Sequence, residues 1–456
     1  MGHPGRRHGS FVETKPARRS FASLAEPRGH PRLRTRMRSF KFHDRRFYLL
    51  ALCLILLAGI FLRLPASIFE KDGAVSNIGR LHPQPGFRIV GYDERLYQKY
   101  VDDLIRYGIS SYPDLAEHYV EVQRRLPAAI LPPTRFVYLF TAYLWHQVFG
   151  ADALASLHNV SSMFSILLLC LTAVFTWRLG GWRVALSVTA LMSFCPTQIH
   201  MSQHALIDGV FAFSATLCLW LLWENLQHPN KWPWLMGYAL ALALLVLTKE
   251  NAMFAYVGLL LVLGANHWLR FGQVSRMLVL LTFAGPLLGV TILVNLCGSL
   301  ATTCSTFQLL VSKASVLPFA IATGDGPWYR YLVDLMLVSP VILVLAIGRI
   351  FTLRTEDKAS LFLLLFVVGS YILMASVRYG MNLRYANMWD LPLRYLAVGC
   401  LTNVTAPLGK RVHWWLGILV GVVCAVEFRQ YFVFFVWHDL YELVTEGLLR
   451  AVRILK

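Results

Sequence analysis

The chain has 456 residues, of which 56% are hydrophobic and 15% are charged, and its mean hydropathy is +0.53. This composition excludes a soluble globular domain and is typical of a chain that lies largely in lipid. The net charge of +18 is concentrated near the N-terminus, where residues 1–46 hold 13 Lys and Arg against 3 Asp and Glu, a local excess of +10.

Basic residues directly precede the first apolar run. They include Arg32, Arg34, Arg36, Arg38, Arg45 and Arg46. A basic segment beside a span faces the cytoplasm, where it would also contact anionic lipids. We therefore interpret residues 1–46 as a disordered cytoplasmic tail, followed by an uncleaved anchor rather than a signal peptide. No nucleic acid is expected as a partner, because no binding fold accompanies the charge.

The apolar runs predict an all-α polytopic membrane protein, because a helix of roughly 20 apolar residues crosses a bilayer and satisfies its own backbone groups. About eleven transmembrane helices are expected. They begin near Phe47, Ala155, Val184, Ile207, Trp234, Met253, Met277, Tyr331, Leu361, Leu391 and Trp414. The spans form a transmembrane domain over residues 47–435, and their odd number places the C-terminal tail, residues 436–456, on the outer face.

This topology puts basic residues in every inner loop, as the positive-inside rule requires. They are Arg178, Arg183, Lys231, Arg270, Arg276, Arg349, Arg354, Lys358, Lys410 and Arg411. A competing topology counts Phe136–Phe149 as a further span, which would expose these loops outside. At fourteen residues that segment is short for a span and favours an interfacial or re-entrant helix.

Two outer segments are longer than simple connectors. Residues 65–133 carry 9 acidic and 8 basic side chains, and short interfacial helices are predicted there over Tyr92–Tyr107 and Leu115–Leu126. Residues 298–328 are expected to form a lid or another interfacial helix. Cys297 and Cys304 flank this second segment, where an oxidising compartment could join them; whether they pair is left open.

Charged side chains at the outer ends of the expected spans are candidates for chemistry, because a charge at bilayer depth is costly and usually lines a cavity. They are Asp93, Glu94, Asp208, Lys249, Glu250, Arg378, Arg384, Asp390 and Arg394. Carboxylates at one position and cations at another suit a base for an acceptor and a clamp for an anionic leaving group. The alternatives are solvated helix faces for the acids and interfacial anchoring for the arginines.

The order of these residues resembles the C-type glycosyltransferases, in the branch of the protein O-mannosyltransferases (glycosyltransferase family 39) and the lipid A aminoarabinose transferase. An early Asp-Glu matches Asp93-Glu94, and Pro-Pro before an aromatic segment matches Pro132-Pro133. Later matches are Asp208, Leu247-Thr248-Lys249 and Arg384-Tyr385 followed by Pro392. The resemblance covers roughly residues 47–409 and implies a polyprenyl-phosphate or dolichyl-phosphate sugar donor and an acceptor lipid, glycan or protein on the non-cytoplasmic face.

The resemblance also implies roles for single residues. Asp93 would be the general base of an inverting transfer, with Glu94 and Asp208 as further catalytic carboxylates. Arg384 and Lys249 are expected to clamp the donor phosphate. Some relatives place Lys before the Pro-Pro, where this chain has Ile130-Leu131, so Arg125 or Arg135 is expected to supply that charge. Substrate contacts are expected from Tyr385, Glu250 and Arg394.

Several matters stay open at this stage. Asp208 helps to hold a metal in some relatives, so no cofactor is certain and a divalent metal is neither assigned nor excluded. The alternatives to a transferase are a lipid or sugar transporter and a catalytically inactive membrane scaffold. A bacterial inner membrane is favoured over the endoplasmic reticulum as the compartment.

Overall fold

The structure is a computed structural model that describes residues 42–65, 91–127, 129–317, 321, 323–377 and 380–455. All regular secondary structure within these ranges is helical, which confirms the predicted all-α class. Residues 1–41 of the predicted basic tail, residues 66–90 of the first outer loop and Arg378 lie outside the described residues. The disorder of the tail and its contact with anionic lipids therefore stay predictions.

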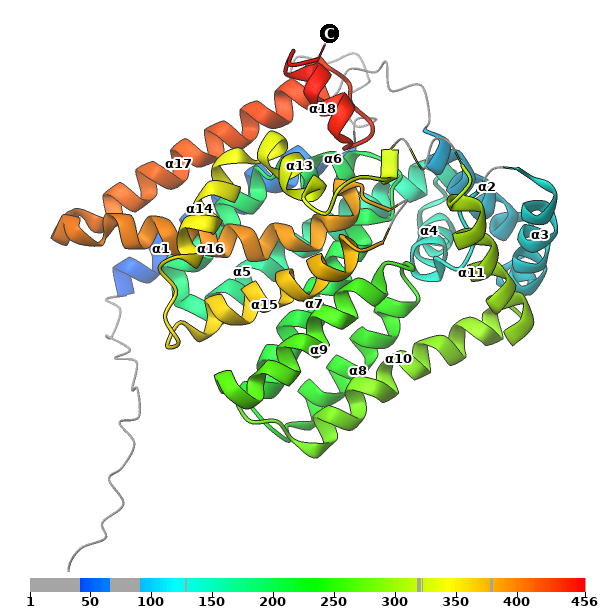
Figure 1. Ribbon diagram of the computed structural model, residues 1–456, viewed down its shortest axis with the longest axis horizontal. Helices are drawn as coiled ribbons and strands as arrows, with labels where there is room; N and C mark the ends of the chain where they lie inside the picture. The colour runs from blue at the N-terminus through cyan, green and yellow to red at the C-terminus, as the bar shows by residue number, and fades with distance from the viewer. Residues whose placement is uncertain are drawn as a thin grey trace, which may run out of the picture. The chain divides into compact units, whose positions relative to one another are not determined.

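The apolar runs form long helices (Figure 1). These are α1 (Phe42–Arg63), α5 (Ala153–Ser193), α7 (Asp208–Gln227), α8 (Trp232–Val246), α9 (Ala252–Leu269), α10 (Arg276–Leu296), α13 (Arg330–Val338), α14 (Pro340–Ile350), α15 (Lys358–Met374), α16 (Asp390–Thr405) and α17 (Val412–Tyr431). The other helices are α2 (Tyr92–Tyr107), η4 (Ile109–Ser111), α3 (Tyr112–Arg125), α4 (Phe136–Phe149), α6 (Pro196–Gln203), α11 (Leu300–Ala314), η5 (Leu383–Trp389), η6 (Ala406–Arg411), η7 (Phe432–Trp437) and α18 (Thr445–Ala451).

Six helices of the described chain are long and apolar enough to cross a membrane, and three shorter apolar helices accompany them. The protein is thus a multi-pass integral membrane protein. Each of the eleven expected spans coincides with helical structure, with α13 and α14 together covering the one expected at Tyr331. The number of crossings and the domain boundaries remain predictions.

A single glycine divides the longest helix into two spans. α5 runs for 41 residues, but Gly181 has φ 78° and ψ −174°, a conformation outside the helical region that strongly favours glycine. The two expected spans at Ala155 and Val184 are the two arms of α5 on either side of this kink. Arg178 and Arg183 flank it, so the kink replaces the predicted inner loop.

Close backbone contact joins α8 to α10. A Cβ atom at Gly285 would lie 2.8 Å from the Ala239 carbonyl oxygen, and one at Gly289 would lie 2.7 Å from that of Ala243. Small residues four apart let membrane helices approach in this way. The pair α8 and α10 packs beside α9, which in turn packs on α15 (Figure 1).

Helices of the first and second outer segments pack together beside the long helices. α2 buries Tyr97, Val101 and Leu104 along one face, as the periodicity of an amphipathic helix requires. α2 contacts α4 and α5, and α11 lies along α3 (Figure 1). The predicted helix over Tyr92–Tyr107 is confirmed, and the one expected at Leu115–Leu126 begins three residues earlier, where Pro113 occupies its first turn.

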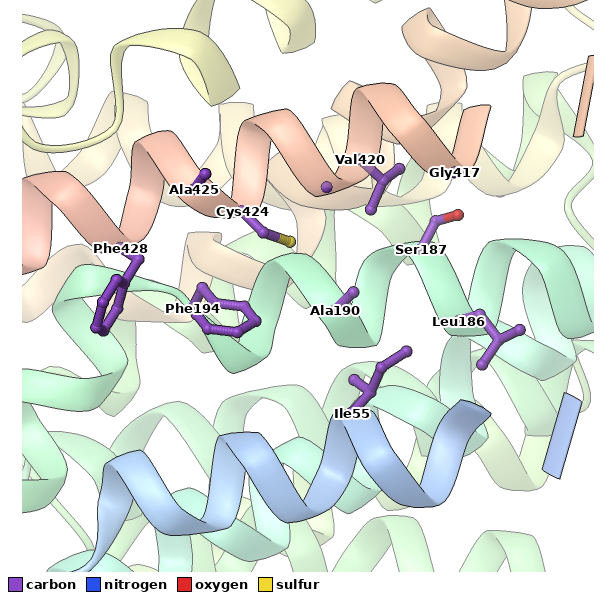
Figure 2. Close-up of a pocket in the computed structure, with 11 residues that line it drawn as sticks. Ile55, Leu186, Ser187, Ala190, Phe194, Gly417, Val420, Cys424, Ala425 and Phe428 are labelled. Atoms are coloured by element: carbon purple, nitrogen blue, oxygen red, sulfur yellow. The ribbon is translucent and has the colours of Figure 1, made fainter. Parts of the chain in front are cut away.

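A groove lies apart from the outer segments. α1, the second arm of α5 and α17 flank a groove of 580 Å³ whose wall on α17 includes Gly417, Gly421 and Ala425 (Figure 2). Cys297 and Cys304 are both free thiols, with Cys297 buried and Cys304 exposed.

We expect Gly289→Ala to destabilise the protein by about 1–3 kcal/mol, because the added methyl group must push the α8 backbone away. Gly264→Ala is the matched control, since a Cβ atom there meets nothing within 4 Å. Thermal unfolding in detergent measures both. Equal melting temperatures for the two variants would contradict the close α8–α10 contact.

Candidate active site

A cavity of 910 Å³ lies between the outer segments and the long helices. Part of its wall is polar and charged, formed by Tyr92, Asp93, Arg135, Lys249, Glu250, Asn251, Asn382, Arg384, Tyr385 and Glu442. The remainder is largely apolar and includes Leu242, Leu245, Val246, Met253, Phe254, Pro286, Phe307, Leu310, Val311 and Leu317. The cavity thus combines a charged region with an extended apolar wall from α8, α9, α10 and α11.

The Arg384 guanidinium joins three carboxylates from distant segments. Its Nη2 lies 2.7 Å from Asp93 Oδ2, its Nη1 lies 3.0 Å from Glu442 Oε1, and its Nε lies 3.6 Å from Asp208 Oδ2. The Arg384 side chain is only 4% exposed. The Asn382 side chain caps η5 by accepting a hydrogen bond from the Arg384 backbone N–H at 3.0 Å, which fixes the start of the helix.

Lys249 brings a second cation to the same group. It lies in the connection between α8 and α9, and its Nζ is 2.7 Å from Asp208 Oδ1 and 4.1 Å from the centre of the Tyr385 ring. Burial lowers the pKa of Lys249, although the charge of Asp208 opposes the shift. Asp208 is completely buried behind Lys249 and Arg384 and does not line the cavity. Asp208 thus contacts both cations from the side away from the cavity.

A third cation lies beside this cluster. Arg135 pairs with Glu250 and donates a hydrogen bond to the Tyr97 hydroxyl of α2. The pair connects the segment before α4 to the connection between α8 and α9. Burial raises the pKa of Glu250, but the adjacent Arg135 more than reverses the effect, so that the pKa lies below its ordinary value. Both residues of this pair line the cavity.

Glu94 faces away from the cavity. Its carboxylate accepts hydrogen bonds from the backbone N–H of Gly91 at 2.7 Å and of Ala205 at 2.8 Å, and lies 3.2 Å from His204 Nδ1. Burial raises the pKa of Glu94, but its contacts with His204 and Gly91 lower it overall to about 2. These contacts cap α2 and join it to the end of α6. Glu94 is therefore held between α2 and the end of α6 and does not line the cavity.

Two expected site residues lie elsewhere. Arg394 is 1% exposed and pairs with Asp390 and Glu427 within α16 and α17, so it does not line the cavity. Its charge is neutralised inside the helix bundle and is not available to a substrate. Arg125 is exposed at the end of α3 and does not line the cavity either. Of the two replacements expected for the missing lysine, the structure brings only Arg135 to the cavity.

The sequence pattern did not indicate Glu442 or Asn382 as site residues. Asn382 Nδ2 donates a hydrogen bond to Glu442 Oε2 at 2.6 Å, and both residues line the cavity. Glu442 belongs to the segment between η7 and α18, which was expected to be an outer tail. The signal available in the sequence was an acidic residue on the outer face shortly after the last span, but nothing in the pattern connected it to Arg384.

Within the described residues, no group of three or more His, Cys, Asp and Glu side chains is arranged to hold a metal ion. Asp93, Asp208 and Glu442 converge on a guanidinium instead. These carboxylates therefore do not fit a metal site in their present arrangement.

Residues 109–311 match the family described as dolichyl-phosphate-mannose-protein mannosyltransferase. The chain carries a domain of this family. This match supports the class that the resemblance implied, the membrane glycosyltransferases that use a polyprenyl- or dolichyl-phosphate sugar. Asp208, Lys249, Glu250 and Arg135 lie inside the matched range. The comparison with curated protein sequences gives no match.

Solved structures share the fold at low sequence identity. ArnT from Cupriavidus metallidurans, in the apo state, is 14% identical with a TM-score of 0.51, over 90% of this chain and 78% of that one. AglB, the oligosaccharyltransferase of Archaeoglobus fulgidus, solved with an inhibitory peptide and a dolichol-phosphate, is 12% identical with a TM-score of 0.55. That match covers 86% of this chain but only 56% of the archaeal enzyme, so the chain spans little more than half of its length.

We expect Glu94→Gln to destabilise the protein by about 1–3 kcal/mol at neutral pH, because a buried charged acceptor is lost. The pKa of Glu94 in the folded state lies below its ordinary value, so its stabilising effect is complete above about pH 4.5 and is lost as the pH falls towards 2. Thermal unfolding of both proteins at pH 6 and pH 3.5 should therefore show a smaller difference at pH 3.5. A constant difference, or an equal effect of Glu117→Gln on the exposed face of α3, would refute this role.

Proposed function

We propose that the protein transfers a sugar from a polyprenyl- or dolichyl-phosphate donor to an acceptor hydroxyl on the non-cytoplasmic face, with Asp93 as general base and inversion at the anomeric carbon. The observation that carries this proposal is the contact of Asp93 with Arg384 in one cavity wall. A base for the acceptor then lies directly beside a cation for the leaving group. We further propose a bacterial inner membrane as the compartment.

The apolar wall supports a lipid-linked donor. The residues from α8, α9, α10 and α11 that line the cavity offer a surface for a polyprenyl chain, and the cations Arg384, Lys249 and Arg135 lie in the same cavity. An amphipathic ligand with a phosphate between its chain and its sugar fits this division. A free nucleotide sugar would leave the apolar wall in contact with water.

The side chains present account for each bond and each proton in the transfer reaction. The acceptor oxygen attacks the anomeric carbon, its proton passes to the Asp93 carboxylate, and the bond from the anomeric carbon to the phosphate oxygen breaks. The electron pair of that bond stays on the phosphate oxygen. Arg384 and Lys249 would stabilise the charge that develops there, and a phosphate is a good leaving group, so no general acid is required.

The orientation of the cavity supports an active face outside the cytoplasm. α7 begins at Asp208 and α8 ends just before Lys249, whereas the opposite ends of these helices meet near Lys231. Lys231 belongs to the basic loops assigned to the cytoplasm by their charge. Asp208 and Lys249 therefore lie at the non-cytoplasmic ends of their helices in the proposed topology.

We expect Asp93→Asn to reduce kcat by about 10²–10⁴-fold with little change in folding, because an amide cannot accept the acceptor proton. The assay uses membranes containing the protein and labelled polyprenyl-phosphate sugars, and follows lipid-phosphate release and sugar transfer at matched expression. Asp102→Asn on the same helix is the control and should retain activity. Full activity of Asp93→Asn would remove Asp93 from the role of essential base.

We expect Arg384→Lys to raise the KM for the donor about tenfold, since a lysine keeps the charge but loses the paired hydrogen bonds that a guanidinium offers a phosphate. Donor titration in the same assay measures the effect. Arg106→Lys, at the exposed end of α2, is the matched control. An unchanged donor KM for Arg384→Lys would place the phosphate elsewhere in the cavity.

A further inference from the structure

The segment that carries Glu442 is fixed against the cavity on both sides. The Leu383 backbone N–H donates to the Leu443 carbonyl oxygen at 3.4 Å, and His200 Nε2 lies 3.0 Å from the Tyr441 carbonyl oxygen. The Thr445 hydroxyl donates to Asp334 Oδ1 at 2.6 Å. Three other segments of the chain thus hold the backbone around Glu442, so the position of its side chain in the cavity is built into the fold.

Glu442 makes the contacts that a phosphate would make. One of its oxygens lies 3.0 Å from Arg384 Nη1 and the other accepts a hydrogen bond from Asn382 Nδ2 at 2.6 Å. A phosphate oxygen is likewise an anionic acceptor for guanidinium and amide N–H groups. Glu442 therefore occupies, on Arg384, the place that a lipid phosphate needs.

The three carboxylates on Arg384 differ in their freedom to leave it. Asp208 is 1% exposed and is also held by Lys249, and Asp93 is 17% exposed at the start of α2. Glu442 is 24% exposed and lines the cavity. It is the most accessible of the three, and its side chain is long enough to turn away while its backbone stays in place.

The charge balance of the ion pairs around Arg384 and Lys249 favours such a movement. Four carboxylates, Asp93, Asp208, Glu250 and Glu442, face three cations, Arg135, Lys249 and Arg384, which leaves one negative charge in excess. A bound phosphate adds another negative charge in a partly buried site, where like charges repel strongly. Burial raises the pKa of Glu442, although the charge of Arg384 opposes the rise, and the charge of Asp93 adds to it.

We propose that Glu442 is a positioning residue that exchanges with the donor phosphate on Arg384. It holds the guanidinium in the absence of donor, moves off when the phosphate binds, and returns after transfer to displace the lipid phosphate product. This inference rests on the proposed role of Arg384 as the phosphate clamp. It predicts that the Glu442 charge weakens donor and product binding, the opposite of what a residue that merely supports Arg384 would do.

The test uses the purified full-length protein in detergent and measures the Kd of a polyprenyl phosphate by calorimetric titration. Glu442→Gln should bind it about tenfold more tightly than the wild type, since a competing charged contact is removed. In the transfer assay the same variant should lower both the donor KM and the rate of product release. Glu446→Gln is the matched control, because Glu446 is 64% exposed and pairs with Arg450 on α18.

Weaker or unchanged binding by folded Glu442→Gln, with wild-type binding intact, would overturn the exchange and leave the transferase proposal standing. No binding by either protein would overturn the phosphate site and the exchange with it. If Glu442→Gln does not fold, Glu442→Asp replaces it, because a shorter carboxylate withdraws from Arg384 and should also tighten binding. Weaker binding by that variant would contradict the exchange equally.

Discussion

The Arg384 guanidinium is the contact on which the arrangement of the cavity depends. It draws together the start of α2, the start of α7, η5 and the segment before α18 through Asp93, Asp208 and Glu442. Burying an unpaired ion costs several kcal/mol, so the buried guanidinium depends on these carboxylates for its place in the fold. Loss of this one cation would leave three carboxylates to repel one another at the meeting point of four segments.

The apolar part of the cavity depends on a different constraint, the close approach of membrane helices. Gly285 and Gly289 bring α10 against the carbonyl oxygens of α8, and this contact fixes one side of the wall that Leu242, Leu245 and Pro286 help to form. Packing therefore shapes the region suited to a lipid chain, while ion pairs shape the region suited to its phosphate. The two regions meet at the connection between α8 and α9, which carries Lys249.

Local pattern was enough to predict much of this structure. Apolar runs located the long helices within a few residues, because a helix that must satisfy its own backbone in lipid has few alternatives. The glycine at position 108 and Pro113 separated α2 from α3 in the sequence as they do in the structure. The family resemblance supplied Asp93, Lys249 and Arg384, which the fold brings to one cavity.

The site residues that differ from expectation have a common physical cause. The sequence shows a charged residue near the end of a span but does not show which residue it pairs with. Arg394 resembled a substrate contact, but Asp390 one turn earlier and Glu427 on α17 neutralise it inside the bundle. Glu94 resembled a catalytic carboxylate, but the backbone N–H groups of Gly91 and Ala205 take up its oxygens. Glu442 was missed because its partners lie in η5, and no periodic pattern links the two segments.

The distance along the chain between Asp93 and Glu442 also has a consequence for biosynthesis. The ribosome adds Glu442 349 residues later than Asp93. The apolar helices between the two positions have by then been synthesised. During insertion, Arg384 is made before its last carboxylate partner and well after its first. The nascent chain therefore completes the set of carboxylates around Arg384 only after α8, α9, α10 and α11, which form the apolar wall of the cavity, have been synthesised.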